Sequence, residues 1–287
     1  MKISKTDRGQ KTLQSLERRL RISNSSEQTI RNYVRHVKSL MDFHDLLPDD
    51  LEIDHIIDFL HDLQVDKERS WRTVKIYVAA FRWFYEHILQ AKEFAHMIPY
   101  PKEKPSLPQL LSREELGRLF DNCENMKHRV MLRLLYSSGL RRTELLHLKI
   151  DDIITGDGKH QIRINKGKGG KDRYTVLSKV ILQELRDYFV KYKPVNYLFN
   201  GREEGSRMSA GGLRHLMIAA TKRARITKPV NLHILRHCFA SHALEEGMNI
   251  KTLQHLMGHS SVQTTMIYLH VSEVPLSKAF SPLDRWQ

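Results

Sequence analysis

Apolar residues in the first third of the chain recur at helical spacing. Ser25 and Gln28 have the spacing of a capped helix start, and the pattern after them predicts a helix over residues 26–43. Two more helices are predicted over residues 53–64 and 71–90. The last of these should bury one stripe of side chains, formed by Val74, Val78, Phe81, Tyr85 and Ile88. This part of the chain is therefore expected to be all-helical.

The helical pattern stops at residues 98–108, which contain four prolines. Proline fixes φ and lacks the backbone N–H that a helix needs, so this stretch favours an extended connection. We therefore predict a helical domain over residues 1–98, a proline-rich linker over 99–108 and a second domain over 109–287.

Beyond the linker the pattern is again mostly helical, with one change of character. Ser112 and Glu115 form a capping box at a helix start, Gly139 ends a later helix, and another begins near Thr143. Residues 161–177 instead favour strands around a tip rich in glycine and lysine, which predicts a β-hairpin. Helices return over residues 180–191, 210–225, 233–245 and 250–256. The expected fold is mainly α, with a mixed α/β second domain that is mostly helical and contains one small antiparallel sheet.

The charge of the chain favours a polyanionic partner. The net charge is +14, and it is unevenly distributed. Residues 1–105 carry 18 basic and 16 acidic groups, whereas residues 106–287 carry 29 and 17. A basic protein with solvated faces is the simpler alternative, but this segregation makes nucleic acid the better hypothesis.

Other features of the composition indicate a soluble intracellular protein. Cys123 and Cys238 lie far apart without metal-ligand spacing and are expected to be reduced thiols. The N-terminal residues lack the apolar segment of a signal peptide, and no apolar run approaches the ~20 residues that cross a bilayer. We expect a cytoplasmic protein without a membrane partner.

A basic stripe lies on the predicted helix over residues 71–90. Arg72, Lys75 and Arg82 share a face away from the apolar stripe, with the small Ala79 between them. Such a face suits a helix that lies against a phosphate backbone. An ordinary solvated surface explains it equally well, so the stripe is only a candidate DNA contact.

Four polar residues interrupt the apolar helical pattern near the C-terminus: His233, Arg236, His259 and Tyr268. A phenol is a nucleophile, and guanidinium and imidazole groups can neutralise and protonate a phosphate under attack. His233 and Arg236 are one helical turn apart and can address one point. Taken singly, each of these residues is more often structural than chemical.

Three residues further upstream complete a possible phosphate site. Arg141 follows a helix end at Gly139 and lies near the start of the next helix, where backbone N–H groups favour anions. Glu144, three residues on, shares its face and can orient it, although a surface ion pair is the simpler explanation. Lys168 lies at the glycine-rich hairpin tip, where Lys166 and Lys171 compete with it for any role.

This set of residues, in this order, resembles the tyrosine recombinase family, which includes phage integrases and Xer-like recombinases. The matching stretches are Ser138–Leu148, Gly167–Arg173, His233–His242 and Leu256–Tyr268. The resemblance covers the whole second domain. More loosely, the first domain resembles the helical, SAM-like core-binding domain of the family, which binds DNA.

The resemblance implies a role for each residue. Arg141 and Arg236 match the arginines that activate the phosphate, and Glu144 matches a supporting acidic position. His233 matches a general base and Lys168 the acid that protonates the leaving 5′ oxygen. His259 matches the residue that contacts the phosphate or tunes the nucleophile. Tyr268 matches the nucleophile itself.

The resemblance also implies a reaction and partners. Tyr268 would attack a scissile phosphate, giving a 3′-phosphotyrosyl link that a second strand resolves, without a metal and without ATP. The partners would be double-stranded DNA with paired recombination sites and other copies of the enzyme, as a homotetramer or as a heterotetramer with a second recombinase. The tail over residues 271–287 is a candidate for exchange between protomers; packing on its own domain is equally expected.

Two alternatives remain open at this point. A type IB DNA topoisomerase shares the tyrosine chemistry but relaxes one duplex without exchanging strands. A DNA-binding regulator can keep the fold without using the chemistry. The separate helical first domain and the residues 258–265 favour the recombinase, for integration or excision of mobile DNA or for dimer resolution.

Overall fold

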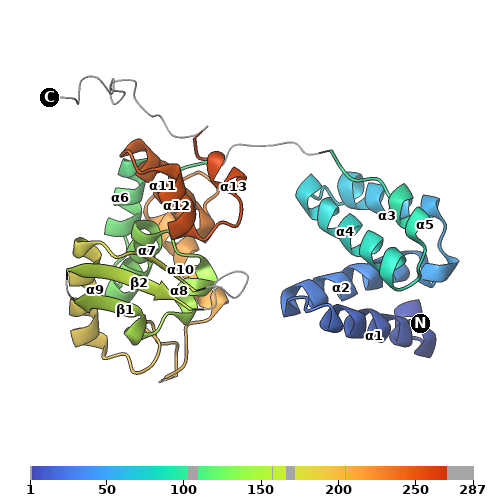
Figure 1. Ribbon diagram of the computed structural model, residues 1–287, viewed down its shortest axis with the longest axis horizontal. Coiled ribbons are helices and arrows are strands. Elements are labelled where there is room, and N and C mark those ends of the chain that lie inside the picture. The colour runs from blue at the N-terminus through green and yellow to red at the C-terminus, as the bar shows by residue number, and fades with distance from the viewer. Residues whose placement is uncertain (1, 103–108, 157, 166–171, 204, 270–287) are drawn as a thin grey trace. The chain divides into compact units, whose positions relative to one another are not determined.

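The computed structural model describes residues 2–102, 109–156, 158–165, 172–203 and 205–269. The chain divides into two compact units, residues 1–106 and 107–287, which are described separately (Figure 1). Lys168, part of the predicted linker and the tail over residues 271–287 lie outside the described residues.

The first unit is helical throughout. Its α-helices are α1 (Asp7–Ile22), α2 (Glu27–His44), α3 (Ile53–His61), α4 (Trp71–His87) and α5 (Lys92–Met97), and a π-helical turn over Asp62–Asp66 follows α3. Its core is one apolar cluster contributed by all five helices. Four members of the stripe predicted for α4 are buried, since Val74, Val78, Phe81 and Tyr85 are each at most 3% exposed. The fifth, Ile88, is the C-cap residue and is only partly buried.

Three details of this unit differ from the sequence prediction. Helices α1 and α5 were not predicted at all. The start of α2 is capped by Ser26, whose hydroxyl accepts a hydrogen bond from the Thr29 N–H at 3.1 Å, rather than by Ser25. Adjacent serines have the same capping chemistry, so the sequence pattern does not separate them.

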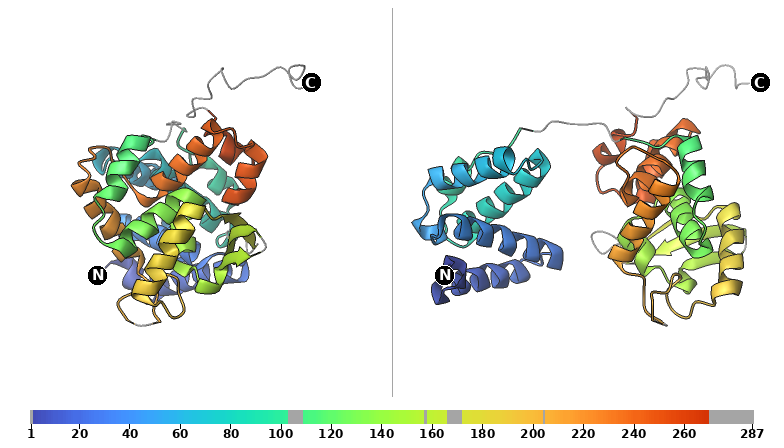
Figure 2. Two further views of the ribbon diagram at one scale, coloured as in Figure 1. Left: turned by 90° about the vertical axis from the view of Figure 1, so that its left-hand side faces the viewer. Right: turned by 180° about the vertical axis from the view of Figure 1, so that it is seen from behind.

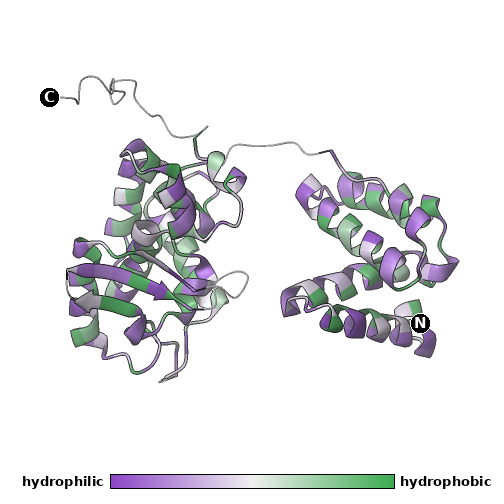
Figure 3. Cartoon of the chain, viewed as in Figure 1, coloured by the Kyte–Doolittle hydropathy of each residue, from purple (hydrophilic) through white to green (hydrophobic). Residues whose placement is uncertain are grey.

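The second unit contains eight α-helices among its described residues. They are α6 (Arg113–Asp121), α7 (Met126–Ser138), α8 (Arg142–His147), α9 (Lys179–Tyr192), α10 (Ala210–Arg223), α11 (Leu232–Glu245), α12 (Ile250–Met257) and α13 (Gln263–Met266). Most carry a hydrophobic and a hydrophilic side, as Figure 3 shows. Helix α7 lies in the middle and contacts α6, α8, α9 and α11 (Figure 2).

One antiparallel sheet completes the second unit. Its strands are β1 (Ile153–Gly156), β2 (Lys159–Ile164) and β3 (Arg173–Val176), in the order β1-β2-β3. Alternate residues of β3 face the core, so Arg173 and Thr175 are buried. The predicted fold class is confirmed, although the sheet has a third strand, β1, beyond the predicted hairpin. Strand β3 contacts both α7 and α12, and this packing brings the site residues together.

Candidate active site

The site begins at the turn between α7 and α8. Gly139 ends α7 in the left-handed region, at φ 61°. A Cβ at this position would lie 2.4 Å from Cδ1 of Phe239 on α11, so glycine is required both for the backbone conformation and for the close packing. The Gly139 carbonyl accepts a hydrogen bond from Nη1 of Arg236 at 2.5 Å. This turn therefore fixes α7, α8 and α11 at one point.

Arg141 is held in place by the first turn of α8. Its backbone N–H donates to Glu144 Oε2 at 2.7 Å, and its Nη1 donates to Oε1 of the same carboxylate at 2.8 Å. Its Nη2 donates to the Gly258 carbonyl, just beyond α12, at 2.9 Å. The contact between Arg141 and Glu144 that the spacing predicts is present, and Glu144 acts as a capping residue as well as an ion-pair partner.

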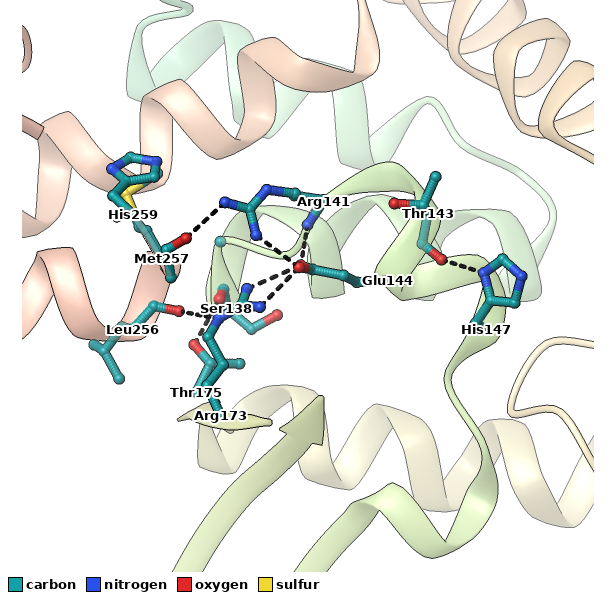
Figure 4. A network of polar contacts seen from close by, with 12 residues as sticks. Ser138, Arg141, Thr143, Glu144, His147, Arg173, Thr175, Leu256, Met257 and His259 are labelled. Atoms are coloured by element: carbon teal, nitrogen blue, oxygen red, sulfur yellow. Dashed lines mark hydrogen bonds and ion pairs between the residues drawn. The ribbon is translucent and has the colours of Figure 1, made fainter. Parts of the chain in front are cut away.

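Sequence reasoning missed Arg173, which joins this network through the Glu144 carboxylate (Figure 4). Its two terminal nitrogens donate to the two oxygens of Glu144 at 2.7 and 2.9 Å, and its Nε donates to the Leu256 carbonyl at 3.0 Å. The Arg173 side chain is 7% exposed. An arginine at an inward-facing position of a strand was the signal, because a buried guanidinium needs such partners.

Glu144 carries its negative charge in a buried place. Burial alone would raise the pKa of its carboxyl group, but the hydrogen bonds and charges of Arg173 and Arg141 outweigh burial and lower the pKa to about 2. Three arginines, including Arg236, thus gather around one ionised carboxylate. The site keeps an excess of positive charge, which suits an anionic ligand.

Arg236, on α11, is almost fully buried, at 1% exposure. Its Nη2 donates to the Met257 carbonyl at 2.6 Å and to Nε2 of His259 at 3.0 Å. Burial first, and then the charge of Arg141, lowers the pKa of Arg236 to about 10, so it remains a cation at neutral pH. Arg141 and Arg236 therefore both bind the turn Met257–His259.

The hydrogen bonds of His259 define its protonation state. A guanidinium only donates, so Nε2 of His259 must accept from Arg236 and carries no proton. Its Nδ1 then holds the proton and donates to Oγ1 of the buried Thr265 at 2.9 Å. Burial and Arg236 lower the pKa of His259 to about 4, which agrees with this neutral form.

Tyr268 lies beside this turn and is 2% exposed. Its ring is nearly parallel to that of His259, with a centroid separation of 6.5 Å. Its hydroxyl shares a hydrogen bond of 2.8 Å with Nδ1 of His237. Burial raises the pKa of the phenol, and the charges of Arg236 and Arg141 oppose this rise. Sequence reasoning missed His237, which directly follows Arg236.

His233 and Lys168 are the remaining residues predicted for this site. His233 is exposed at the start of α11. Its ring centroid lies 4.5 Å from the ring centroid of His237. It also lines an open groove of about 640 Å³ together with Arg141, Arg142 and Arg214. Lys168 cannot be placed, because it lies outside the described residues.

The basic stripe of the first unit belongs to a separate compact unit. Arg72 is exposed and its guanidinium lies 4.7 Å from the Trp71 ring centroid. Arg82 donates from Nε to the Ile98 carbonyl at 3.0 Å and from Nη2 to the His96 carbonyl at 3.2 Å. Arg82 thus anchors the end of α5 and does not simply extend from the surface as the stripe suggested.

The described residues were compared with the side-chain arrangements that bind metal ions and with the long apolar helices that cross membranes. Across residues 2–102, 109–156, 158–165, 172–203 and 205–269, no group of three or more His, Cys, Asp or Glu side chains is arranged to hold a metal ion. Over the same residues no helix is long and apolar enough to cross a membrane.

The second unit is a helical domain with a small antiparallel sheet, in which two arginines converge on one turn beside a buried phenol. This arrangement suits the transfer of a phosphate to tyrosine. The chain belongs to the phage integrase family of tyrosine recombinases. Residues 109–274 match the phage integrase family, and residues 12–93 match its SAM-like N-terminal domain.

Individual relatives support the same assignment. The integrase/recombinase y4qK of Sinorhizobium fredii is 32% identical over 272 residues, which cover 94% of this chain and 88% of that one. Tyrosine recombinase XerD of Listeria innocua is 30% identical over 277 residues, covering 89% and 92%. The crystal structure of the XerH site-specific recombinase bound to palindromic difH substrate has a TM-score of 0.72 and 22% identity, covering 91% of this chain and 82% of that one, which shows the shared fold.

The predicted enzyme class is therefore confirmed: this is a site-specific tyrosine recombinase. Neither the topoisomerase nor the regulator alternative is favoured by these relatives.

Proposed function

We propose that the enzyme cleaves and rejoins DNA strands through Tyr268, with the scissile phosphate bound by Arg141 and Arg236. One observation carries this proposal. Both guanidinium groups hydrogen-bond to the turn Met257–His259, and His259 stacks on the ring of Tyr268. The turn therefore connects the phosphate-binding charges to the nucleophile.

Charge explains why two arginines are suited to this role. A phosphodiester repels nucleophiles, and its non-bridging oxygens gain charge as the five-coordinate state forms. Guanidinium groups that are already oriented stabilise that charge without reorganisation. Glu144 and Arg173 supply this orientation, since Glu144 holds Arg141 through its backbone and its side chain, and Arg173 holds Glu144.

The cleavage step gives a 3′-phosphotyrosyl bond and a free 5′-hydroxyl. Lys168 is proposed to protonate the leaving 5′ oxygen, and His233, which lines the groove, to assist proton transfer. A 5′-hydroxyl from a second duplex then attacks the phosphotyrosyl bond. The arginines supply the positive charge that a metal would otherwise bring, and the covalent bond retains the energy that ATP would supply. We therefore propose a reaction without a cofactor.

The proposed substrate is double-stranded DNA with paired recombination sites, bound by a homotetramer or by a heterotetramer with a second recombinase. The related XerH recombinase has been crystallised with its difH substrate, which supports a duplex partner. In this proposal residues 1–98 form a DNA-binding domain, in which Arg72 and Lys75 contact the phosphate backbone. Arg82 contributes by fixing the end of α5. Such an enzyme would act in the cytoplasm, at the nucleoid.

The biological role would be integration or excision of mobile DNA, or resolution of chromosome dimers. The relatives of this chain include an integrase/recombinase and the tyrosine recombinase XerD, which supports a role within this range. Paired inverted repeats in the DNA beside the gene would identify the role and the site.

The proposal is tested by covalent capture of DNA on the protein. The duplexes have randomised sequences, so the protein itself selects the recombination site. A library of randomised, nicked duplexes is incubated with the protein, and complexes that survive denaturation are sequenced. The wild type should enrich a related set of duplexes with a bound 3′ end, because a nick near the cleavage point releases the strand needed for rejoining. Tyr268→Phe should enrich none.

Tyr136→Phe is the matched control, since its hydroxyl also bonds a histidine of α11, His242, at 3.0 Å. This variant should capture the same duplexes as the wild type. Equal capture by Tyr268→Phe would refute the nucleophile, and rapid relaxation of plasmids that lack the captured sequence would favour a topoisomerase.

A further inference from the structure

The hydroxyl of Tyr268 has a defined hydrogen-bond partner. Nδ1 of His237 lies 2.8 Å from the phenol oxygen, and the two ring centroids are 5.5 Å apart. Tyr268 is 2% exposed, so bulk water has almost no access to this side chain. A phenol must lose its proton to form a bond to phosphorus, and a side-chain base at hydrogen-bond distance from the phenol oxygen is positioned to accept that proton.

Other groups near the phenol are already committed or only donate. Nε2 of His259 accepts from Arg236, and its Nδ1 donates to Thr265. The guanidinium groups of Arg236 and Arg141 have no acceptor. His233 is exposed, and its ring contacts His237. Among these groups, Nδ1 of His237 is the nitrogen at hydrogen-bond distance from the reacting oxygen.

We propose that His237 is a catalytic residue of the reaction proposed above, the general base that accepts the proton of Tyr268. As the phenol oxygen forms its bond to phosphorus, the phenol proton moves to Nδ1 of His237. The bond from phosphorus to the 5′ oxygen breaks, and its electron pair stays on that oxygen, which takes a proton from the acid assigned to Lys168. Rejoining reverses each transfer.

The surroundings of His237 suit a base. The groups that face it are His233 and Arg236 on α11 and Tyr268 after α13, while His259 after α12 stacks on the phenol. Burial first, and then His233 and Arg236, lowers the pKa of His237 to about 4, so the ring is neutral and able to accept. A phosphate bound at Arg236 would add negative charge and favour the imidazolium that forms during attack.

The pH dependence of cleavage tests this role. The substrate is the duplex obtained by covalent capture, carrying sulfur in place of the bridging 5′ oxygen, so that the leaving group needs no acid. The wild-type rate of adduct formation should be constant between about pH 6 and pH 9, because a positioned base stays unprotonated throughout.

His237→Asn keeps an acceptor near the position of Nδ1 but removes the base. Its rate should fall at least ~100-fold near neutral pH and rise about tenfold per pH unit, because the phenol must then ionise in advance. His242→Asn is the matched control: it disturbs the other His–Tyr pair of α11, with Tyr136, and should keep the rate constant with pH.

Each outcome is decisive. A His237→Asn rate that is constant with pH, whatever its size, would assign His237 a structural role and overturn the proposal. A wild-type rate that rises tenfold per pH unit would overturn it even if the variant failed to fold. If the wild type forms no adduct with any duplex while remaining folded, the proposed function fails first, and this base assignment fails with it.

Discussion

Replacing Glu144 by glutamine removes the carboxylate that binds both the buried Arg173 and the half-buried Arg141. The carboxyl pKa of about 2, against an ordinary ~4.3, corresponds to roughly 3 kcal/mol of stabilisation at neutral pH, at ~1.4 kcal/mol per pKa unit. Because the folded pKa is lowered, this stabilisation is complete above the unfolded pKa and is lost as pH falls from about 4 towards 2. Glu144→Gln should therefore lower the free energy of unfolding by about 3 kcal/mol at neutral pH, measured by urea unfolding with far-ultraviolet circular dichroism.

The same substitution should slow adduct formation, because Arg141 loses its anchor. A reduction of ~10- to 100-fold is expected from misplacing one phosphate-binding group. Glu184→Gln is the control, since Glu184 makes a single, partly exposed ion pair with Arg133 at 3.1 Å, which should be worth less than ~1 kcal/mol. If Glu144→Gln is no less stable than Glu184→Gln and cleaves at the wild-type rate, the network does not orient the site.

Four further substitutions test other contacts of the protein. Gly139→Ala should lose about 2 kcal/mol or more of unfolding free energy in urea, because its φ is 61° and a Cβ would lie 2.4 Å from Phe239. Arg82→Ala should destabilise the protein by about 2 kcal/mol in the same assay, through lost bonds to backbone carbonyls, whereas Arg72→Ala should mainly weaken DNA binding in a salt-dependent retention assay. Burial lowers the pKa of His36 to about 4, so the wild type should lose stability as pH falls from about 6.5 to 4, and His36→Phe should lack this loss in urea unfolding at each pH.

The sequence contained most of the site, because its chemistry depends on residue types in a fixed order. Arg141 and Glu144 contact each other, as a spacing of three residues on one helix face predicts. Arg236 and His259 also meet. Arg236 lies on α11 and His259 lies in the turn after α12, so local spacing alone would not pair them, and their order in the chain was needed.

The residues that sequence reasoning missed act through tertiary contacts. Arg173 reaches Glu144 only because β3 packs beside α12 and points the residue inward. His237 meets Tyr268 only because the segment after Gly258 turns back across α11. The sequence shows that His237 directly follows Arg236 on the predicted helix. It does not show which side chain from a distant part of the chain His237 contacts.

The secondary structure was likewise predicted well where the local sequence pattern is strong and missed where it is weak. Helices with a wide apolar stripe, such as α4, were predicted nearly to their ends. Helix α1 has a narrow apolar stripe, with Leu13, Leu16 and Leu20 among many charged residues. This helix was missed because its many basic residues made the apolar spacing hard to recognise. Strand β1, Ile-Ile-Thr-Gly, does not alternate between buried and exposed positions as β3 does, so no period of two marked it as a strand.

The identity of the nucleophile is tested most directly by mapping the covalent bond. The adduct formed with the captured duplex is digested with protease and nuclease, and the peptide that carries a nucleotide is sequenced by mass spectrometry. We expect one modified residue, Tyr268, joined through its phenol oxygen to a 3′-phosphate. A nucleotide on any other residue, or a bond to a 5′-phosphate, would contradict it.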